Sequence, residues 1–355
     1  MIINFIIPNI PSKPTGGYKI MYEYANQFAL GGHDVCVYHV ATIKLAPYYR
    51  LPHWIRIIRT LVCYPNSKPN WFSLDKRIKT KNVPYLKKKY LRDADVTITT
   101  MWATVLELDS LDLKGIKVNL IQGYETWFGD VTFVHKSFFA KMVHVVISDY
   151  LANVFSQITN DRAYLLPNPI EDKFCVKIDP KNRDRTTVAM LYSAHSYKGS
   201  DFGVEALIYC KKSLPSLKVK MFGTLDRPDK LPQWIEYVKT PKDVNEIYNG
   251  VAVFVSPSIN DGWDLPCTEA MKCGCALVCT NIAGHTQYAK DGNTALLAQP
   301  YDSKDLADKI IKVIDDDDLR FKLVENGIKE VEKYTMQESY KRFCEILLKS
   351  QLKNE

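Results

Sequence analysis

The chain has 355 residues, of which 46% are hydrophobic and 25% are charged, and 47 basic against 40 acidic residues give a formal net charge of +7. This composition is typical of globular proteins and argues against a disordered, collagenous or coiled-coil chain. The length favours two domains over one. A small positive excess does not by itself indicate binding to nucleic acid, and no apolar run approaches the roughly 18 residues of a membrane-spanning helix.

The cysteine pattern favours a reduced protein without a structural metal. The nine cysteines are an odd number, as expected for a cytoplasmic chain, in which disulfides rarely persist. Cys267, Cys273, Cys275 and Cys279 lie close together, but they form no C-x-x-C pair and have no histidine at zinc spacing. We therefore expect small buried thiols there.

The first segment predicts a strand, a glycine loop and a helix. Ile2–Ile7 is a continuous apolar run without the basic leader of a signal peptide, and it predicts a buried parallel strand. Gly16 and Gly17 follow, and apolar residues then recur every three to four positions between 20 and 28. Val35–Val40 predicts the next strand, which completes one βαβ unit.

Residues 41–92 interrupt this alternation and are strongly basic. They contain 13 Lys or Arg and a single acid, Asp75, for a net charge of +12. Aromatic residues are interleaved with these charges, at Tyr48, Tyr49, Trp54, Tyr64 and Trp71. One interpretation is a solvated insertion. The other is a basic, aromatic surface for an anionic membrane or a pyrophosphate-bearing acceptor.

Strands and helices alternate again after this segment, on both sides of a hinge near 165–185 that is rich in Pro, Asn and charge. The predicted strands are Val96–Thr100, Lys117–Gln122, His144–Ile147, Thr187–Tyr192, Leu217–Phe222, Val251–Val255 and Ala276–Cys279. This order predicts an α/β protein with two Rossmann-like, doubly wound parallel sheets. In such pairs ligands bind at the carboxyl ends of the strands, in the cleft between the domains.

Residues 260–274 are the most informative stretch for function. Asp261 and Glu269 stand eight positions apart, the first in a loop and the second in the first turn of a helix that begins near Pro266. This arrangement can direct both acids into one cleft. The alternative is that Glu269 only complements the helix dipole.

This stretch resembles the E-x7-E signature of retaining glycosyltransferases of family 4, which have the GT-B fold. The positions that match in register are Gly262, Leu265, Pro266, Glu269, Ala270, Met271 and Gly274. Further short motifs of the family follow in the expected order along the chain: Gly16-Gly17, Ile147-Ser148, Pro167–Ile170, Lys198-Gly199 and Asp291–Leu297. The resemblance implies domains at 1–165 and 166–335, with a final helix, 336–355, that packs back on the first domain.

The resemblance also implies roles for individual residues. Lys198 would neutralise the donor diphosphate, Asp261 would contact the donor sugar, and Glu269 would bind the ribose hydroxyls. The backbone around Gly262, at the amides of Trp263, Asp264 and Leu265, would approach the sugar and diphosphate. Gly16, Gly17 and Gly199 would let the chain come close to the phosphates.

Three positions depart from the family pattern. Ser193 stands where the family commonly has an arginine, so one phosphate-binding cation is missing unless Arg185, His195 or Arg227 replaces it. Asp261 replaces a glutamate and is one methylene shorter. Asp264 replaces a glycine, and its carboxylate can either bind a sugar hydroxyl or cap the following helix. His285, in a loop where the family often faces the donor, is a weaker candidate for a donor contact.

The amino-terminal half carries a second group of candidate residues. Gln122 replaces the family's histidine, and a glutamine cannot act as a base. The stretch from Gln122 through Glu125, Trp127 and Phe128 resembles a subgroup that includes bacterial rhamnosyltransferases of surface polysaccharide synthesis. Gln122, Glu125 and Trp127 would then lie on the acceptor or sugar side, although Glu125 fits equally well as a buried acid paired with a basic neighbour.

The sequence therefore predicts a retaining glycosyltransferase that uses a dTDP- or UDP-linked sugar, with dTDP-rhamnose as one candidate donor. The acceptor would be a glycan or a polyprenyl-diphosphate-linked glycan at the inner face of the cell membrane, and residues 41–92 would meet the anionic membrane surface. We expect no metal and no other cofactor, since no Asp-x-Asp motif is flanked as a metal site. The alternatives are an epimerase or phosphorylase of the same fold, or a non-catalytic glycan- or membrane-binding protein.

The net charge is unevenly divided between the two halves. Residues 1–165 carry 20 basic and 12 acidic side chains, or +8, whereas residues 166–355 carry 27 and 28, or −1. The positive charge therefore belongs to the expected acceptor-side domain and not to the expected nucleotide site.

Overall fold

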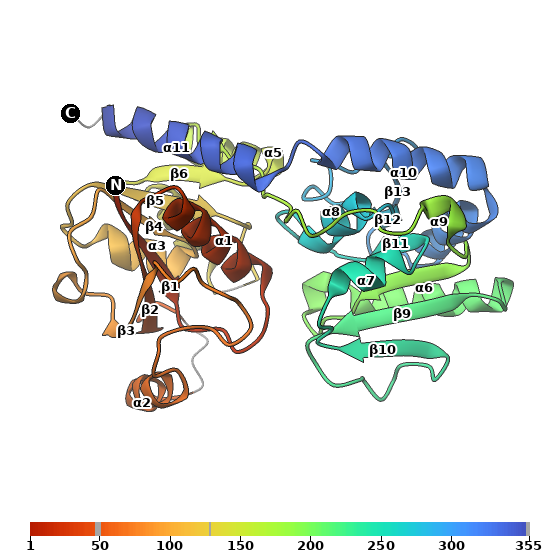
Figure 1. The fold of residues 1–355 in the computed structure, drawn as a ribbon, viewed down its shortest axis with the longest axis horizontal. Coiled ribbons are helices and arrows are strands. Elements are labelled where there is room, and N and C mark those ends of the chain that lie inside the picture. Colours follow the sequence, from red (N-terminus) through yellow and green to blue (C-terminus); the bar gives the residue numbers. More distant parts are fainter. Residues whose placement is uncertain (47–50, 128, 353–355) are drawn as a thin grey trace. The chain divides into compact units, whose positions relative to one another are not determined.

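The structure is a computed structural model that describes residues 1–46, 51–127 and 129–352, and it divides into two compact units (Figure 1). The first comprises Met1–Asn168 with Gln337–Glu355, and the second Pro169–Met336. The boundaries expected from the sequence were 165/166 and 335/336. Tyr48, Tyr49 and Phe128, which we singled out in the sequence, lie outside the described residues.

The first unit is built on a parallel seven-stranded sheet in the order β3-β2-β1-β4-β5-β6-β7. Its strands are β1 (Ile2–Pro8), β2 (Asp34–Thr42), β3 (Lys79–Tyr85), β4 (Val96–Thr99), β5 (Ile116–Ile121), β6 (Val143–Val146) and β7 (Tyr164–Leu165). The central strands are mostly apolar, with few polar residues such as Asn4 in β1, because helices bury both faces of a parallel sheet. β1, for example, is buried from Ile3 to Ile7.

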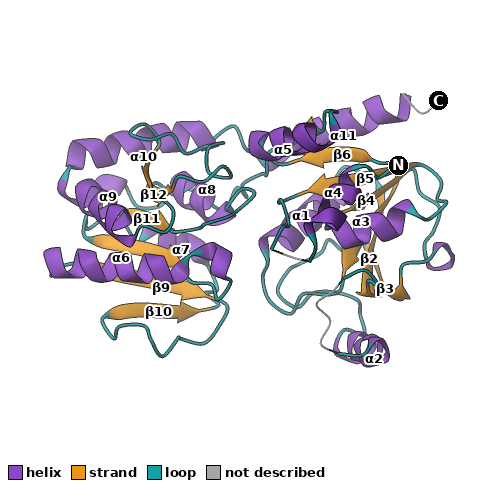
Figure 2. Cartoon of the chain, turned by 180° about the vertical axis from the view of Figure 1, so that it is seen from behind, coloured by secondary structure: helices purple, strands orange, loops and turns teal. Residues whose placement is uncertain are grey.

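Helices flank this sheet (Figure 2). They are α1 (Gly16–Leu30), α2 (His53–Cys63), α3 (Trp102–Asp109), α4 (Val131–Phe138), α5 (Asp149–Thr159) and the last helix, α11 (Met336–Leu352). α11 packs on α1, where the ring of Phe343 lies 5.1 Å from that of Tyr24 and 5.4 Å from that of Phe28. No helix in the described part of the chain is long and apolar enough to cross a bilayer.

The described residues of the basic segment 41–92 include a helix and a strand of the sheet. It supplies α2 and the edge strand β3, which pairs in parallel with β2. Trp71 is not a surface aromatic: its ring packs 5.9 Å from that of Tyr22, and its Nε1–H donates to the carbonyl of Pro11 at 2.8 Å. Trp54, in contrast, is 63% exposed.

The second unit repeats the same topology with six parallel strands, in the order β10-β9-β8-β11-β12-β13. The strands are β8 (Thr187–Leu191), β9 (Lys218–Gly223), β10 (Ile235–Lys239), β11 (Val253–Ser256), β12 (Ala276–Thr280) and β13 (Ala295–Ala298). The helices are α6 (Ser200–Ser213), α7 (Val244–Asn249), α8 (Leu265–Lys272), α9 (Ser303–Asp315) and α10 (Asp317–Val331). The fold class is therefore the predicted one, with two doubly wound α/β domains.

Two strands of this second sheet were not expected from the sequence. β13 overlaps the end of the motif Asp291–Leu297, for which we predicted no strand, and β10 is an edge strand in which charged and apolar residues are mixed. Edge strands lack the continuous apolar pattern of central strands because one side remains open to solvent.

Candidate active site

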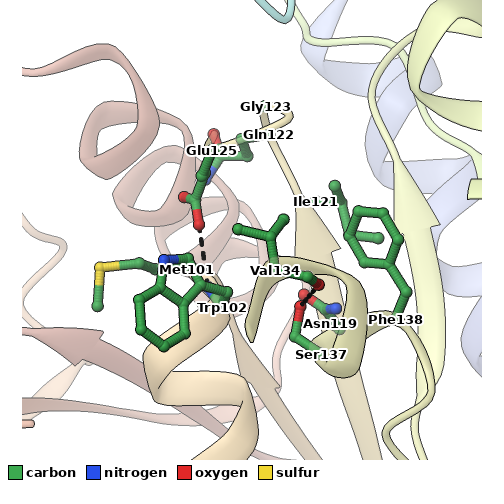
Figure 3. A pocket seen from close by; sticks show the side chains of 10 residues that line it. All are labelled: Met101, Trp102, Asn119, Ile121, Gln122, Gly123, Glu125, Val134, Ser137 and Phe138. Carbon is green, nitrogen blue, oxygen red and sulfur yellow. Dashed lines mark hydrogen bonds between the residues drawn. The ribbon is translucent and has the colours of Figure 1, made fainter. Parts of the chain in front are cut away.

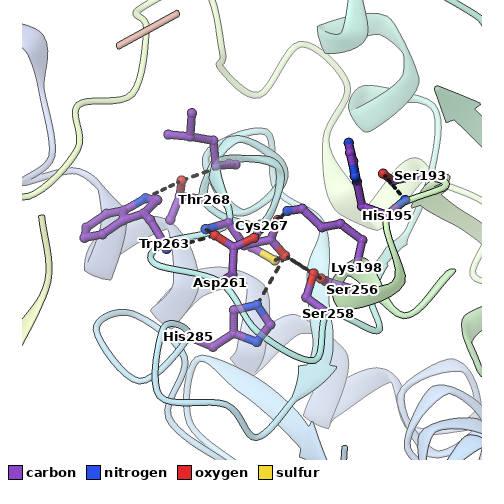
Figure 4. A network of polar contacts seen from close by, with 12 residues as sticks. Ser193, His195, Lys198, Ser256, Ser258, Asp261, Trp263, Cys267, Thr268 and His285 are labelled. Atoms are coloured by element: carbon purple, nitrogen blue, oxygen red, sulfur yellow. Dashed lines mark hydrogen bonds and ion pairs between the residues drawn. The ribbon is translucent and has the colours of Figure 1, made fainter. Parts of the chain in front are cut away.

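The predicted residues of the second unit meet in the loops that follow β8, β11 and β12 (Figure 4). The order of strands reverses between β8 and β11, which lie side by side. In doubly wound sheets this switch point is where ligands bind, because the connections on either side diverge and leave a crevice at the carboxyl ends of the strands. A small pocket at this edge is lined by Lys198, Ser256, Ser258 and Asp264, among others.

Lys198 is held between two carboxylates. Its Nζ lies 2.5 Å from Oδ2 of Asp261 and 2.8 Å from Oδ1 of Asp264. Burial by itself would lower the pKa of Lys198, but the two carboxylates raise it above its usual range. The ammonium therefore stays charged, and its position is set before any ligand arrives.

Asp264 is the centre of a buried polar network. Its Oδ2 accepts from Ser256 Oγ at 2.5 Å and from Ser258 Oγ at 3.2 Å, and it lies 3.2 Å from Nε2 of His285. The residue adopts a left-handed backbone conformation, with φ of 63°, which aspartate tolerates better than most residues. The side chain does not cap α8, so that expectation is wrong.

The ion pair of Asp264 and His285 sits inside this network. Nδ1 of His285 lies 2.8 Å from the carbonyl of Thr280, so both ring nitrogens face acceptors and the ring must carry two protons. Burial alone would lower the pKa of His285, but Cys279 and Asp264 raise it well above its usual value. Burial alone would raise the pKa of Asp264, but Lys198 and His285 hold it well below. His285 is buried and supports Asp264.

The side chain of Asp261 accepts hydrogen bonds from two of the backbone amides that we expected to face the donor. Its Oδ1 accepts from the amides of Trp263 at 3.1 Å and of Asp264 at 3.0 Å. The indole of Trp263 is buried and donates to Thr268 Oγ1 at 3.4 Å. The Asp261 carboxylate therefore binds to donors, two amides and the Lys198 ammonium, that could instead bind an anionic or hydroxyl-bearing group of a ligand.

Glu269 lies in the second turn of α8 and not in the first, because the helix begins at Leu265. It is therefore too far along the helix to complement the dipole at its start. The side chain is 8% exposed, and its Oε2 accepts from the hydroxyl of Tyr248 at 3.2 Å. Tyr248 is a partner that sequence reasoning missed. A buried, oriented carboxylate of this kind can bind vicinal hydroxyls.

Ser193 leaves the family's phosphate-binding arginine position without a cation, and the three candidate substitutes, Arg227, Arg185 and His195, differ in their surroundings. The guanidinium of Arg227 donates to the carbonyls of Ile235, Leu231 and Pro232, and Arg185 lies 3.9 Å from Asp317. His195, in contrast, is exposed, stacks on Tyr197, and donates its backbone N–H to Ser193 Oγ.

Gly199 allows Lys198 to sit close to the neighbouring strand. Its φ is +61°, and a Cβ at this position would lie 2.0 Å from the carbonyl oxygen of Pro257. Any other residue would push the segment after β8 away from the loop after β11.

Part of the network could in principle bind a metal. Ligand atoms of Asp264, Cys267 and His285 lie within 4.8 Å of one another, and all three residues are buried. However, Asp264 already accepts from the Lys198 ammonium, which would repel a cation. The network is satisfied by hydrogen bonds, and the expected independence from metal stays a prediction. The cysteines at 267, 273, 275 and 279 are buried free thiols.

Arg183 is a buried positioning residue that sequence reasoning missed. Its guanidinium donates to the carbonyls of Tyr248 and Val251 at 3.1 and 3.0 Å, and to those of Cys273 and Gly274 at 2.6 and 3.2 Å. These carbonyls follow α7 and α8, where helices leave acceptors unsatisfied. Arg183 thereby joins the helix that carries Tyr248 to the helix that carries Glu269.

The predicted residues of the first unit also gather at the carboxyl ends of strands. Gln122 follows β5, and its Nε2 donates to the carbonyl of Gly17 at 3.1 Å and to Thr100 Oγ1 at 3.2 Å. Gly16 and Gly17 are the first residues of α1, and Thr15 before them makes no side-chain cap. Gln122 therefore connects the glycine loop to the end of β4.

Glu125 lies in the loop after β5. Its Oε2 accepts from the backbone N–H of Trp102, the first residue of α3, at 3.0 Å (Figure 3). The two residues line one pocket together with Gln122 and Met101. Met101 has a φ of +70°, an uncommon value for a residue with a side chain. Trp127 is 42% exposed, and its ring reaches within 3.0 Å of where a Cβ on Gly123 would be. Within the described residues Glu125 forms no ion pair with a basic neighbour, and its carboxylate accepts from a backbone amide instead.

Glu125 makes the stability of the protein depend on pH. Burial raises its pKa to about 7, although the Trp102 N–H opposes the shift. A carboxyl with a raised folded pKa contributes most below its unfolded value near 4.5, and this contribution is lost as pH rises through 7. The variant Glu125→Gln has no such carboxyl. The difference in unfolding free energy between this variant and wild type should therefore grow, in favour of the variant, by about 2 kcal/mol as pH rises from roughly 5 to 8. Urea unfolding of both proteins across this range measures the difference, and a constant difference would contradict the assignment.

The second unit matches a known family. Residues 176–330 match the model described as glycosyl transferases group 1. An N,N'-diacetylbacillosaminyl-diphospho-undecaprenol alpha-1,3-N-acetylgalactosaminyltransferase of Campylobacter jejuni is 28% identical over 100 residues, which is 28% of this chain and 27% of that protein. The capsular polysaccharide biosynthesis glycosyltransferase CapM of Staphylococcus aureus is 28% identical over 146 residues, 37% of this chain and 38% of its own length. The chain thus matches only about a quarter to two fifths of these relatives.

Solved structures extend the likeness to the whole chain. TarM aligns over 97% of this chain and 98% of its own, with a TM-score of 0.77 at 11% identity. HepE of Anabaena, solved in complex with UDP-glucose, aligns over 98% of this chain and 100% of its own, with a TM-score of 0.73 at 12% identity. At these identities the likeness concerns the fold alone. The chain therefore has the GT-B fold, and residues 176–330 of its second unit match the model of glycosyl transferases group 1.

Proposed function

We propose that this protein is a retaining, metal-independent glycosyltransferase that moves a sugar from a nucleoside diphosphate to a glycan or lipid-linked acceptor. The observation that carries the proposal is the fixed ammonium of Lys198 at the switch point of the second sheet, next to the amides of Trp263 and Asp264. A cation and N–H groups in this arrangement suit a leaving diphosphate.

The chemistry requires charge stabilisation at the leaving group. As the glycosidic bond to the diphosphate breaks, negative charge grows on the phosphate oxygen and positive charge grows on the sugar. Fixed donors stabilise the first charge without reorganising, which is how oriented groups lower a barrier. When the donor binds, its phosphates or hydroxyls take over contacts that Asp261 makes in the unliganded protein. The departing phosphate then accepts the proton of the acceptor hydroxyl, so retention needs no protein base.

The donor proposed is a dTDP- or UDP-linked sugar, with dTDP-rhamnose as one candidate. The segment from Gln122 to Trp127 supports the rhamnose assignment through its resemblance to rhamnosyltransferases. The likeness to HepE, solved with UDP-glucose, supports a pyrimidine nucleotide. Buried Glu269, oriented by Tyr248, would bind both ribose hydroxyls of a UDP-linked sugar, or the single 3'-hydroxyl of a dTDP-linked one.

The acceptor proposed is a glycan, or a glycan on a polyprenyl diphosphate, at the inner face of the cell membrane. The Campylobacter relative is named for an acceptor that carries a diphospho-undecaprenol, which supports this class. Gln122, Glu125 and Trp127 would lie on the acceptor or sugar side in the first unit. The +12 charge of residues 41–92 would place that unit against anionic lipid or the acceptor diphosphate.

Donor binding and product analysis test this function. A thermal-shift panel of dTDP-, UDP- and GDP-sugars identifies the donor, because a ligand of the native state raises the melting temperature. Transfer is then measured with and without chelator, and the anomeric configuration of the product is assigned by NMR. An epimerised donor without acceptor would favour the epimerase, and no binding by any nucleotide would favour a non-catalytic protein. Loss of transfer on adding chelator would contradict metal independence.

Glu269→Gln should weaken binding of the nucleotide donor without unfolding the protein. A hydrogen bond to a charged group contributes about 1.5–3 kcal/mol, so we expect the Kd for the nucleotide to rise about tenfold or more. The amide can still accept from Tyr248, which preserves the position of α8. Calorimetric titration with the nucleoside diphosphate measures this, and a 2'-deoxy, 3'-deoxy nucleotide serves as the control. If both proteins bind both nucleotides equally, Glu269 does not contact the ribose.

A further inference from the structure

The polarity of α2 is reversed relative to a normal surface helix. Its buried residues are Arg56 and Thr60, which share one face of the helix four positions apart. On the opposite side Trp54, Ile58, Leu61 and Val62 are 63%, 52%, 55% and 71% exposed. This spacing of i, i+4, i+7 and i+8 is that of an apolar stripe, which in a globular protein ordinarily faces the core. We call these four residues the apolar stripe of α2.

The charge of the segment that contains α2 indicates that the apolar stripe binds an anionic bilayer. Residues 41–92 carry a net charge of +12. Several exposed lysines and arginines of this segment form no ion pair within the described part of the chain: Lys44, Arg59, Lys68, Lys76, Lys81, Lys87 and Lys89. Arg59 lies on α2 itself. An apolar stripe with a tryptophan, on a segment with this excess of exposed basic side chains, has the chemistry of helices that lie in the headgroup region of anionic membranes.

We propose that α2 is an in-plane membrane anchor that inserts the apolar stripe into the headgroup–acyl boundary of an anionic lipid bilayer. α2 has 11 residues, too few to span a bilayer, so it would lie along the surface. Arg56 and Thr60 remain turned towards the protein, and the exposed basic side chains reach the lipid phosphates. The inference rests on the proposed function only in that a lipid-linked acceptor would be presented at this surface.

Flotation of purified protein with vesicles tests the anchor. Wild type should float with phosphatidylcholine vesicles that contain phosphatidylglycerol, and less with phosphatidylcholine alone. Ile58→Ser/Leu61→Ser should lower the partition coefficient about tenfold. The matched control is Leu30→Ser/Leu348→Ser on α1 and α11, whose side chains are 57% and 55% exposed; it should float like wild type. Binding should weaken at high salt but persist in part, since the apolar contribution is not screened.

Three results would overturn the anchor. They are equal flotation of the α2 variant and the control, failure of wild type to float, and a wild-type dimer in light scattering that the α2 variant alone breaks. The last would make the stripe an interface between two copies of the chain. The proposed function is followed separately, by nucleotide thermal shift and by transfer to a water-soluble acceptor, and both should be unchanged in the α2 variant. If transfer fails in every variant while flotation behaves as expected, the function is wrong and the anchor stands.

Discussion

Lys198→Ala should reduce transfer by about a hundredfold to a thousandfold, because removing one group that stabilises a developing negative charge has an effect of this size. The ammonium lies 2.5 Å from Asp261 and 2.8 Å from Asp264 in the unliganded protein. Without it, two carboxylates face the diphosphate, and like-charge repulsion adds to the loss. Steady-state kinetics with the identified donor measure the change in kcat and kcat/KM.

The control for this result separates catalysis from folding. Lys198 also neutralises Asp264, so its loss lowers stability as well as activity. Lys198→Arg keeps the charge and should retain the fold, with activity partly restored. Lys211→Ala, at a half-buried lysine of α6 whose Nζ donates to the carbonyls of Pro215 and Leu217, is a matched substitution outside the site. Full activity in Lys198→Ala with an intact melting curve would remove the donor-site assignment.

Asp264→Asn should destabilise the second unit by about 3 kcal/mol or more, because removing one partner of a buried ion pair leaves the other charge uncompensated. Asparagine has nearly the same shape and tolerates the left-handed backbone, so the change isolates the charge. His285 would then lose its counter-ion, and Lys198 would keep only Asp261. We expect the melting temperature to fall by about 10 °C, given a unit of this size.

Two comparisons make this stability effect specific. Asp261→Asn alters the other carboxylate on Lys198, whose side chain is 17% exposed against 3% for Asp264, and its effect should be smaller. A double-mutant cycle with His285→Gln should show strong non-additivity, since the two residues share one network. An Asp264→Asn protein that melts with wild type would mean that the Asp264–His285 pair contributes nothing to stability.

Local pattern was sufficient for most of the fold. The apolar runs at Ile2–Ile7 and Thr187–Tyr192 predicted β1 and β8 because a buried parallel strand is apolar along its length. β10 and β13 were missed, since an edge strand and a short strand in a glycine-containing loop lack that signal. The same reasoning counted Trp71 as a surface aromatic, although Tyr22 and Pro11 bury it from distant parts of the chain.

The candidate site was predictable in its residues but not in its contacts. Lys198, Asp261 and Glu269 were selected by motif, and Lys198 does contact Asp261 across 63 positions of sequence. Glu269 was predicted in the first turn of α8 but lies in the second, because the helix begins at Leu265, one residue before the proline that we took as its start. His285 was noted only as a weak candidate for a donor contact, and not as the partner of Asp264. Tyr248 in α7 and Arg183 before β8 were missed, because nothing local marks them.

The sequence by itself determined the alternation of strands and helices, the order of the motifs and the location of the positive charge in residues 41–92. These follow from side-chain periodicity and from counting, which act along the chain. Only the tertiary structure decided that Asp264 turns inward to Lys198 and His285, and that α2 turns its apolar stripe outward and its arginine inward. The physical reason is that burial and charge pairing depend on which distant segments meet, and periodicity describes a helix face without saying what covers it.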